Sequence, residues 1–494
     1  MLNSTSASVP GRPEIIALTG DMIVGTRAAA ALAGQALVLF VLGTAPVLFG
    51  AVQAWVWPVY VAAMAGAFLL LPWAGPRAAW TPGFDAGRAA VGLFLGLTLL
   101  ACLPLPPALV DWLSPERFAL LSEAGAVSGA PPAAWTLSYA PLASLAWWAL
   151  LLGLALLFRV LGVQLAEARF LQAVLWVLFG LAVLEALYGL LQALIPNLGV
   201  LWVTYLKAGM GDARGTYINR NHFAGFLGML LPLLLGFGLS RVRWGERIRF
   251  RELLHSELLH QHMLMVLGLV VMGLALLFSK SRGGITGTLV GLLVFFVFLR
   301  GGARRLPRAV WWVCGLFAGL ILIYGLRIGF DPIIDRFLAL EQGNSRLDYW
   351  RDSLPLIAGH PFGIGLAAFK TVFPVYDTAL HSESVTAVYL HNDVLQLLVE
   401  AGWAGFALLG GAFAVFMRRA FRRIRRMDAA RAPRRFFLAA GAYGGLAAMT
   451  VHAFFDFNLQ IPANMIYFVL LMAVVRATTR GAQDRPEGGG AALS

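Results

Sequence analysis

Long runs of apolar residues, broken by short polar or basic segments, dominate the chain from residue 28 onwards. Many runs reach about 20 residues, the length an α-helix needs to cross a hydrocarbon layer of roughly 30 Å. A backbone inside a membrane must satisfy its own hydrogen bonds, so these runs predict helices. The pattern therefore predicts an all-α integral membrane protein with about twelve transmembrane helices, at residues 28–49, 53–74, 89–105, 142–160, 170–195, 222–240, 262–279, 284–300, 309–328, 393–417, 436–454 and 461–476.

Composition supports this fold class and excludes two others. Of the 494 residues, 59% are hydrophobic and only 13% are charged, about half the share of roughly 25% in soluble domains. An ordinary soluble enzyme and an intrinsically disordered protein are thus excluded. The net charge of +13 does not indicate a nucleic-acid partner, because the arginines occur in short clusters between apolar spans.

The same clusters predict the orientation of the chain. With the N-terminus in the cytoplasm, 27 of the 38 Lys and Arg residues fall in inner segments and 11 in outer ones. Because short cytoplasmic loops carry an excess of Lys and Arg, we expect both termini to be cytoplasmic. Residues 1–27 show no basic segment followed by an apolar core and a cleavage site, so we expect no removable signal peptide.

The chain divides into a short leading segment, two groups of helices and a tail. The predicted parts are a cytoplasmic segment at 1–27, N-terminal helices at 28–261, a second group at 262–476 that contains a long outer loop at 329–392, and a disordered cytoplasmic tail at 477–494. No soluble domain, internal repeat or low-complexity segment is expected.

Two outer segments are long. Residues 106–141 are rich in Pro, Ala and Ser and predict a surface loop. The loop at 329–392 has apolar residues at helical spacing between Arg346 and Ile357, so we expect short helices that pack on the bundle. Gly and Pro in the segment 360–365 should end that helical stretch.

Two outer arginines are candidates for binding phosphate groups. Arg282 lies in the short break between the seventh and eighth spans, and Arg346 lies in the long loop. A guanidinium group stays charged and donates two parallel hydrogen bonds, which suits a diphosphate at the boundary of lipid and water. Together the two could neutralise charge on a departing diphosphate. The alternatives are a snorkelling interfacial arginine for Arg282 and a loop salt bridge for Arg346.

His391 is the strongest candidate for a general base. An imidazole with an ordinary pKa of about 6.5 can accept a proton from a sugar hydroxyl near neutral pH. His391 lies at the start of the tenth span, where the helix dipole favours the neutral ring. A capping or packing histidine is the alternative. Gly402 and Gly405 are expected to allow close helix packing.

Other polar residues are weaker candidates. The polar cluster at the start of the sixth span, Asn219 to His222, either binds sugar or caps that helix. His452 and Asp456, four residues apart, are expected to form a structural pair or to line the cavity. Glu185 is an intramembrane carboxylate, a functional flag by default, with no evident partner. No outer set of His, Asp and Glu has compact metal-ligand spacing, so we expect no metal. The candidates for substrate binding are Arg214, Asn219, Arg220, His222, Tyr349, Arg351 and Asn392.

At these positions the chain resembles a known family. His391-Asn392, nine residues and then Gly402-x-x-Gly405 is similar to the H-[NSQ]-x(9)-G-x-x-G signature of bacterial O-antigen ligases. Other family landmarks are matched by Ser281-Arg282-Gly283, Ser345-Arg346 with Trp350, His360-Pro361-Phe362-Gly363-Ile364-Gly365, and His452 with Asp456-Phe457-Asn458-Leu459.

The family comprises O-antigen ligases, Wzy-type polysaccharide polymerases and some protein O-oligosaccharyltransferases. The resemblance implies a GT-C-like membrane glycosyltransferase in the bacterial inner (cytoplasmic) membrane. It implies transfer of a glycan from undecaprenyl diphosphate at the periplasmic face, without metal or other cofactor. It also implies that Arg282 and Arg346 bind the diphosphate and that His391 acts on the acceptor.

The segment from Arg214 to His222 resembles exopolysaccharide polymerases more than lipid A-core ligases, which favours an inverting polymerase. The alternative is a ligase that transfers the glycan to lipid A-core. The expected partners are the lipid-linked oligosaccharide donor, a glycan or lipid A-core acceptor, membrane lipids and a chain-length regulator. A flippase or other secondary transporter is the rival from another class. It predicts charged or broken-helix sites at the bilayer midplane in matching halves, whereas polar groups here gather at one face.

Overall fold

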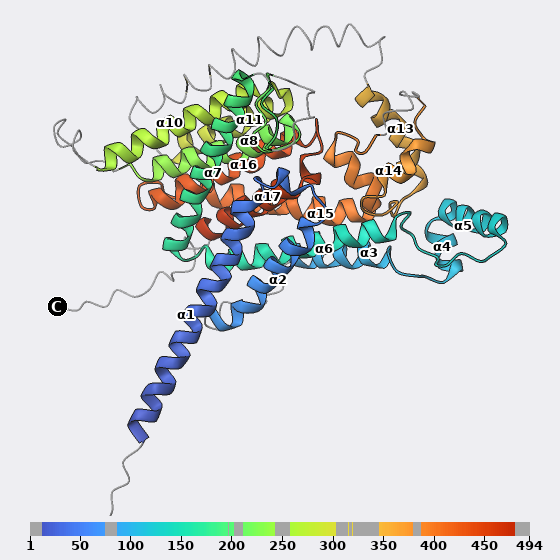
Figure 1. Cartoon of the computed structure of the whole chain (residues 1–494), viewed down its shortest axis with the longest axis horizontal. Coiled ribbons are helices and arrows are strands. Elements are labelled where there is room, and N and C mark those ends of the chain that lie inside the picture. The colour runs from blue at the N-terminus through green and yellow to red at the C-terminus, as the bar shows by residue number, and fades with distance from the viewer. Residues whose placement is uncertain are drawn as a thin grey trace, which may run out of the picture.

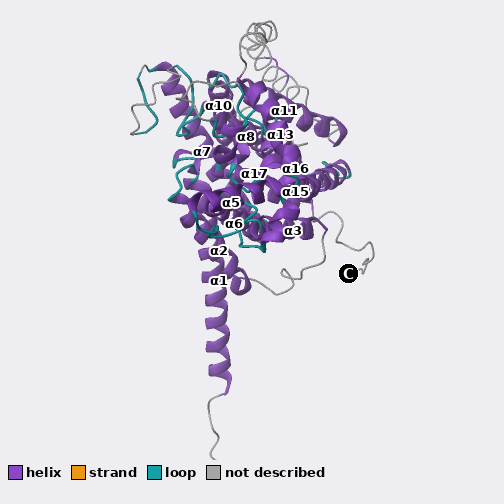
Figure 2. Ribbon diagram, turned by 90° about the vertical axis from the view of Figure 1, so that its right-hand side faces the viewer, coloured by secondary structure: helices purple, strands orange, loops and turns teal. Residues whose placement is uncertain are grey.

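The computed structural model of the chain describes residues 12–74, 86–195, 197–201, 211–242, 257–302, 345–378 and 387–479, together with residues 315 and 319. The regular structure of these ranges is helical (Figure 2), as expected. Nine helices among them are long and apolar enough to cross a membrane. The described part of the chain is therefore all-helical, as in a multi-pass membrane protein. The expected span at 309–328 lies outside the described residues, apart from residues 315 and 319.

The helices follow the predicted order along the chain. Their bounds are α1 Arg12–Thr44, α2 Val56–Ala74, α3 Ala86–Leu100, α4 Pro107–Leu113, α5 Pro115–Ser128, α6 Pro141–Gln164, α7 Ala168–Leu194, α8 Arg220–Ser240, α10 Glu257–Phe278, α11 Arg282–Gly302, α13 Ser345–Gly359, α14 Phe369–Val372, α15 Asp393–Arg425, α16 Pro433–His452 and α17 Pro462–Thr479. Short 3₁₀ turns lie at η1 Phe49–Ala51, η3 Phe373–Val375 and η4 Asn458–Gln460.

Several helix edges differ from the predicted ones, and among the described helices the start of α1 differs by the most. Helix α1 begins at Arg12 instead of near residue 28, so part of the expected N-terminal segment is helical and α1 projects from the bundle (Figure 1). Helix α3 covers only 15 residues and is the shorter apolar helix beside the nine candidate spans. The link between α1 and α2 is tight: Gly50 has a φ of +71°, and a Cβ there would lie 2.9 Å from the Tyr217 ring.

The centre of the bundle is formed by α8, α11 and α16, whose backbones touch. A Cβ added at Gly236 of α8 would collide with the carbonyl of Phe437 in α16, and one at Gly291 of α11 would collide with the carbonyl of Gly444. In lipid, small residues drive helix association because they let backbones approach. The glycines therefore fix how far these three helices slide along one another, and so where their ends lie.

Helix α16 confirms the helix expected at 436–454 and is a central helix of the bundle. It is rich in Ala and Gly and is not among the nine candidate spans, yet almost all of its residues from Phe436 to Met449 are buried. Its small side chains face protein and not lipid, so it needs close fit more than apolar bulk.

The prediction of a surface loop at 106–141 is wrong, because this segment contains α4 and α5. Both helices have Pro at the first position, where a missing N–H costs nothing. The segment packs against α13 and its continuation: Glu116 accepts a hydrogen bond from Tyr376 at 3.1 Å, and the hydroxyl of Tyr139 lies 2.7 Å from Nε2 of His360.

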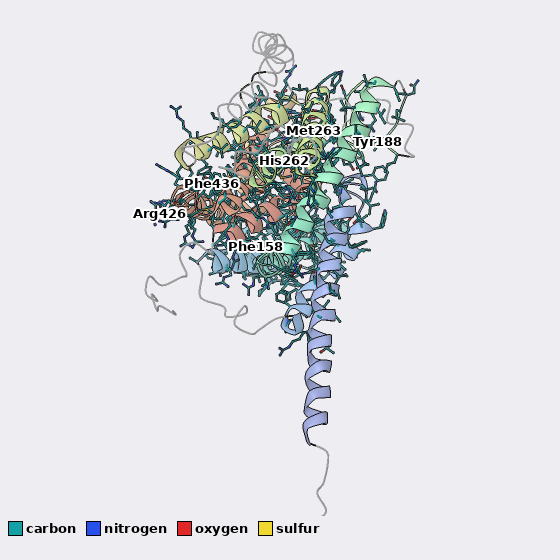
Figure 3. All side chains as sticks on the ribbon, turned by 90° about the vertical axis from the view of Figure 1, so that its left-hand side faces the viewer. Phe158, Tyr188, His262, Met263, Arg426 and Phe436 are labelled. Carbon is teal, nitrogen blue, oxygen red and sulfur yellow. The ribbon has the colours of Figure 1, made fainter. Side chains whose placement is uncertain are left out.

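The described part of the long loop, residues 345–378 and 387–392, lies at one end of the bundle beside α4 and α5 (Figure 1). It has its own hydrophobic cluster, which includes Tyr349, Ile364 and Phe373 and also contacts α15 through Leu398. The opposite end, viewed in Figure 3, carries Arg426 of the basic segment after α15. The helix ends that meet near the loop form the site described next.

Candidate active site

Four remote segments meet where α8 and α11 begin and α16 ends. The amide of Asp393, first residue of α15, donates to the carbonyl of Ala453 after α16 at 2.8 Å. The side chain of Asn464 in α17 donates to the carbonyl of His222 in α8 at 3.1 Å. A Cβ at Gly283 of α11 would lie 2.7 Å from Cδ2 of His452. The link between α16 and α17 is therefore surrounded by the starts of α8, α11 and α15.

Asp456, in that link, is the centre of the site. Its Oδ1 lies 3.2 Å from Nδ1 of His391, and its Oδ2 lies 3.7 Å from Nη2 of Arg346 and accepts a hydrogen bond from Asn221. Oδ1 also lies 4.0 Å from Nε2 of His222. We call these five residues the Asp456 cluster. It joins α8, the long loop, the start of α15 and the α16–α17 link around one carboxyl group.

The Asp456 carboxyl is kept ionised by its neighbours. Its side chain is only 2% exposed, and burial by itself would raise its pKa. The hydrogen bond with His391 and the surrounding cationic groups, Arg346 among them, nevertheless hold the pKa of Asp456 below its ordinary value. An ionised carboxylate only accepts hydrogen bonds. Nδ1 of His391 must therefore donate to it, and in a neutral ring this leaves Nε2 as the proton acceptor.

His391 combines this orientation with access to solvent. Its side chain is 28% exposed, whereas that of Asp456 is buried. Its backbone has a φ of +53°, the left-handed region that few residues other than glycine adopt. The next residue, Asn392, caps α15 by accepting hydrogen bonds from the amides of Val394 and Leu395. The ring is thus held at the helix start, as expected, but it does not itself cap the helix.

An aromatic group lies beside His391. Phe457 packs edge-on against His391, with ring centres 4.7 Å apart, and against His222 at 4.6 Å. Tyr389 stacks on the other side of Phe457 at 4.5 Å. Burial raises the pKa of Tyr389 to about 12, so its hydroxyl stays neutral. The rings restrict the two imidazoles to one orientation.

The two candidate arginines belong to the same region. Arg346, at the start of α13, donates through Nη1 to the carbonyl of Phe455 at 2.8 Å, and its side chain is 37% exposed. Arg282, the first residue of α11, is half-buried, and a Cβ on its neighbour Gly283 would lie 3.5 Å from Cβ of Phe455. Arg346 therefore contacts the residue that precedes Asp456, and the start of α11, which carries Arg282, lies beside the same residue.

The segment before α8 is held by hydrogen bonds to Glu185 of α7. The sequence alone had indicated no partner for this carboxyl group. The Glu185 carboxylate accepts hydrogen bonds from the amide of Thr216 at 2.8 Å and from its hydroxyl at 2.7 Å. Gln192 accepts from the amide of Arg214 at 3.2 Å and donates to the carbonyl of Gly215 at 2.8 Å. These bonds from α7 place the segment that carries Asn221 and His222.

A second ionic group, not anticipated, lies on the same side. Asp212 is buried and pairs with Arg220 and with Lys280, whose Nζ lies 2.9 Å from its Oδ1. Lys280 also has a positive φ, +54°, in the turn before Arg282. Arg214 is half-buried, and its guanidinium donates to the carbonyl of Ile218 at 3.3 Å. The group joins the Arg214–His222 segment to the break between α10 and α11.

Four other candidates have evident local roles. Asn219 caps α8 by accepting from the amide of Asn221, and Asn392 caps α15. Tyr349 is buried edge-on against Phe373. Arg351 is mostly exposed and pairs with Asp348 and Asp352 on its own helix. Among the described contacts, none joins the side chain of Tyr349 or Arg351 to the Asp456 cluster.

The expected pairing of His452 with Asp456 is not a hydrogen bond. Helix α16 ends at His452, so Asp456 does not continue the helical face and instead turns toward His391. Nδ1 of His452 is buried without a hydrogen-bond partner. The ring packs against Gly283, next to Arg282, so it lines the site from inside.

Gly402 has a role beyond helix packing. Its φ of +65° interrupts α15, and a Cβ there would collide with the carbonyl of Pro361. The amide of Trp403 donates to that carbonyl at 2.9 Å, and Ile364 donates to the carbonyl of Val399 at 3.1 Å. The 360–365 segment and the Gly402 break are thus one unit that fixes the loop on α15. Gly405 packs as expected, with Phe94 of α3 nearby.

No group of three or more His, Cys, Asp and Glu side chains in the described ranges is arranged to hold a metal ion. In the Asp456 cluster the four other residues are cationic or neutral around one carboxylate, and the carboxyl group of Asp393 lies nearby. This arrangement suits an anionic ligand and a proton acceptor placed beside it.

Comparison with known proteins identifies a family for part of the chain. Residues 267–410 match the family model described as O-antigen ligase. The match includes Arg282, Arg346 and His391, and it ends before Asp456. No curated protein matches the chain.

Proposed function

We propose that the protein transfers a glycan from a polyprenyl diphosphate carrier to a sugar hydroxyl, because residues 267–410 match the family model described as O-antigen ligase. One observation carries the proposal. One oxygen of the Asp456 carboxylate accepts a hydrogen bond from the candidate base His391, and the other oxygen lies beside the guanidinium group of Arg346. A proton acceptor and a phosphate-binding group are thereby held next to each other.

In the proposed reaction His391 activates the acceptor. Nδ1 donates to Asp456 and Nε2 takes the proton of the acceptor hydroxyl. The acceptor oxygen forms a bond to C1 of the donor sugar while the bond from C1 to the diphosphate oxygen breaks. Attack from the side opposite the leaving group inverts the configuration at C1. Asp456 stabilises the imidazolium that forms, as the carboxylate does in other His–Asp pairs.

The leaving group is assigned to the arginines. The bonding electrons depart with the diphosphate, which gains negative charge as the bond breaks. Arg282 and Arg346 neutralise that charge by charge-assisted hydrogen bonds. The hydrogen bond of Arg346 to Phe455 and the closeness of Gly283, next to Arg282, to the same residue support this assignment. Helix ends meet there, so the isoprenoid chain of the carrier can extend into lipid while its diphosphate stays at the boundary. The proposal places this end of the bundle at the periplasmic face and both termini in the cytoplasm of a bacterial inner membrane.

Within this activity we favour a polysaccharide polymerase. The Arg214–His222 segment, which resembles exopolysaccharide polymerases, contributes Asn221 and His222 to the Asp456 cluster. A ligase that uses lipid A-core as acceptor is the second candidate, because the matched family model is described as O-antigen ligase. The donor is a lipid-linked oligosaccharide in both cases, and a chain-length regulator is a proposed partner of the polymerase.

The test uses His391→Asn, because Asn tolerates a left-handed backbone better than most residues. In a strain that lacks the chromosomal gene, the variant should lower long-chain surface glycan by about 100-fold at unchanged protein level. Arg346→Ala should do the same. Normal long-chain glycan in His391→Asn would refute the proposal.

Purified protein separates the candidate activities. Lipid-linked repeat units alone should become longer chains if the protein is a polymerase, whereas a ligase needs added lipid A-core to form product. Movement of the lipid-linked glycan between leaflets without any new glycosidic bond would instead identify a transporter.

A further inference from the structure

The residue proposed as the base has a backbone conformation that its surroundings must enforce. A non-glycine residue with a φ of +53°, as in His391, persists where the structure fixes it from both sides. On the C-terminal side, Asn392 caps α15 and Asp393 donates to the carbonyl of Ala453. On the N-terminal side the support comes from residues outside the Asp456 cluster.

Leu390 is that support, and it is held by two side chains. Its carbonyl accepts a hydrogen bond from the indole of Trp350 at 2.8 Å. Its amide donates to Oε1 of Gln396 at 2.9 Å. The peptide groups on either side of Leu390 are therefore both anchored, one by α13 and one by the first turn of α15.

Gln396 is held in turn by Glu400, one turn further along α15. Nε2 of Gln396 donates to Oε1 of Glu400 at 2.8 Å. The Glu400 carboxylate also accepts from the backbone amides of Ala367 and Phe369, which belong to the outer loop. Hydrogen bonds thus run without a break from that loop through two side chains to the residue before His391.

This pair is not an ordinary helix-surface pair. Residues four apart on a helix often interact in solvent, but Gln396 is fully buried and Glu400 is 5% exposed. Buried polar groups are costly unless every partner is in place. Here each of the two side chains has partners outside its own helix, so the pair connects segments and does not merely stabilise α15.

We propose that Gln396 and Glu400 are positioning residues for His391. They hold Leu390 so that the His391 imidazole points at Asp456, and they couple that orientation to residues 367–369 of the outer loop. The proposal deepens the glycan transfer proposed above and rests on it for the role of His391. The orientation of the ring, however, is measurable without any substrate.

Exchanging the two side chains provides a sharp test. In Glu400→Gln an amide group faces the donors of the loop and of Gln396. In Gln396→Glu two buried carboxyl groups meet, and above neutral pH, where they do not share a proton, they repel each other. In the double variant Gln396→Glu/Glu400→Gln, the amide at 400 donates to the carboxylate at 396, which accepts from Leu390. The total charge equals that of the natural pair. A positioning role therefore predicts damage in each single variant and recovery in the double variant.

The first measurement is the rate at which diethyl pyrocarbonate modifies His391 in full-length protein purified in detergent, followed by mass spectrometry of its peptide. A ring released from Asp456 becomes more accessible, so each single variant should react about five-fold faster and the double variant within about two-fold of the natural rate. His452, which is buried, serves as an internal reference for intact folding. Gln164→Glu is the matched control, because it buries a carboxylate at the other end of the bundle; it should leave His391 unchanged.

The second measurement is long-chain surface glycan, which should fall in each single variant and return in the double variant. Natural His391 rates in both folded single variants would overturn the positioning role. So would a double variant that folds, as the His452 reference reports, but does not recover. If the His391 rates respond as expected while His391→Asn still makes normal glycan, the positioning role stands and the proposed transferase function fails.

Discussion

Nδ1 of His391, just before α15, lies 3.2 Å from Oδ1 of Asp456. Asp456 is 65 positions further along the chain, in the link between α16 and α17. The buried carboxylate selects the tautomer of an exposed ring, because an ionised group can only accept the hydrogen of Nδ1. The same carboxylate lies beside the guanidinium of Arg346. Proton transfer and anion binding are therefore linked through one side chain.

Asp456→Asn should disable the protein without unfolding it. An amide at this position can still fill the space, but it can donate to Nδ1 and so favour the wrong tautomer of His391. We expect glycan transfer to fall by about 100-fold or more, measured as long-chain glycan per unit of membrane protein. Full activity in this variant would show that His391 does not depend on Asp456.

Acid should destabilise the natural protein more than Asp456→Asn. The folded pKa of Asp456 is lowered relative to an unfolded value of about 3.9. The carboxylate therefore contributes its full stabilisation above about pH 5, and this contribution is lost as the pH falls toward the folded pKa. The Tm of the natural protein should drop more steeply than that of the variant between about pH 5 and pH 3. Parallel curves would contradict the assigned charge state.

Arg346→Lys should lower transfer although it keeps the positive charge. A lysine ammonium cannot donate two parallel hydrogen bonds to a diphosphate, nor reach both Phe455 and Asp456 as the guanidinium does. We expect about a ten-fold loss, mainly as weaker use of the lipid-linked donor. Lys370→Ala removes a charge from an exposed residue of the same loop and should retain activity. Full transfer by Arg346→Lys would instead indicate that the positive charge at this position is sufficient.

Gly402→Ala should destabilise the protein, and Gly411→Ala should not. Position 402 has a φ of +65° and no room for a Cβ beside Pro361, whereas nothing lies within 4 Å of a Cβ at Gly411 of the same helix. We expect a loss of about 1–3 kcal/mol in the first case and a gain of about 0.5–1 kcal/mol in the second. Thermal unfolding in one detergent provides the comparison, and similar Tm values would contradict the kinked geometry.

Most helices could be predicted because membrane spans carry a strong length and apolarity signal. The failure at 106–141 has a physical cause. Proline was interpreted as a helix breaker, but at Pro107 and Pro115 it occupies the first helical position, where it favours a helix. The start of α1 was missed because the residues before 28 are less apolar than the span that follows.

The candidate residues could be selected one by one from the sequence, but the contacts between them could not be predicted. His391, Arg282 and Arg346 were recognisable by residue type, by position and by resemblance. The spacing of His452 and Asp456 suggested a pair with each other, because spacing assumes that a helix continues. Helix α16 ends at His452, and only the three-dimensional arrangement of helix ends shows that Asp456 belongs to His391. Asp212 and Gln396 carried no sequence signal that set them apart from other polar residues.

The contact of α8, α11 and α16 through glycines has a consequence for turnover. Where peptide groups of neighbouring helices touch directly, as at Gly236 and Gly291, no flexible side chains remain to absorb sliding. The middle of the molecule should thus behave as a stiff frame and not as a gate that opens alternately to either side. Any motion that admits large saccharides should therefore involve the peripheral helices α4, α5 and α13. Related proteins that differ in polymer size or acceptor preference should differ in these helices, while the central helices stay constant.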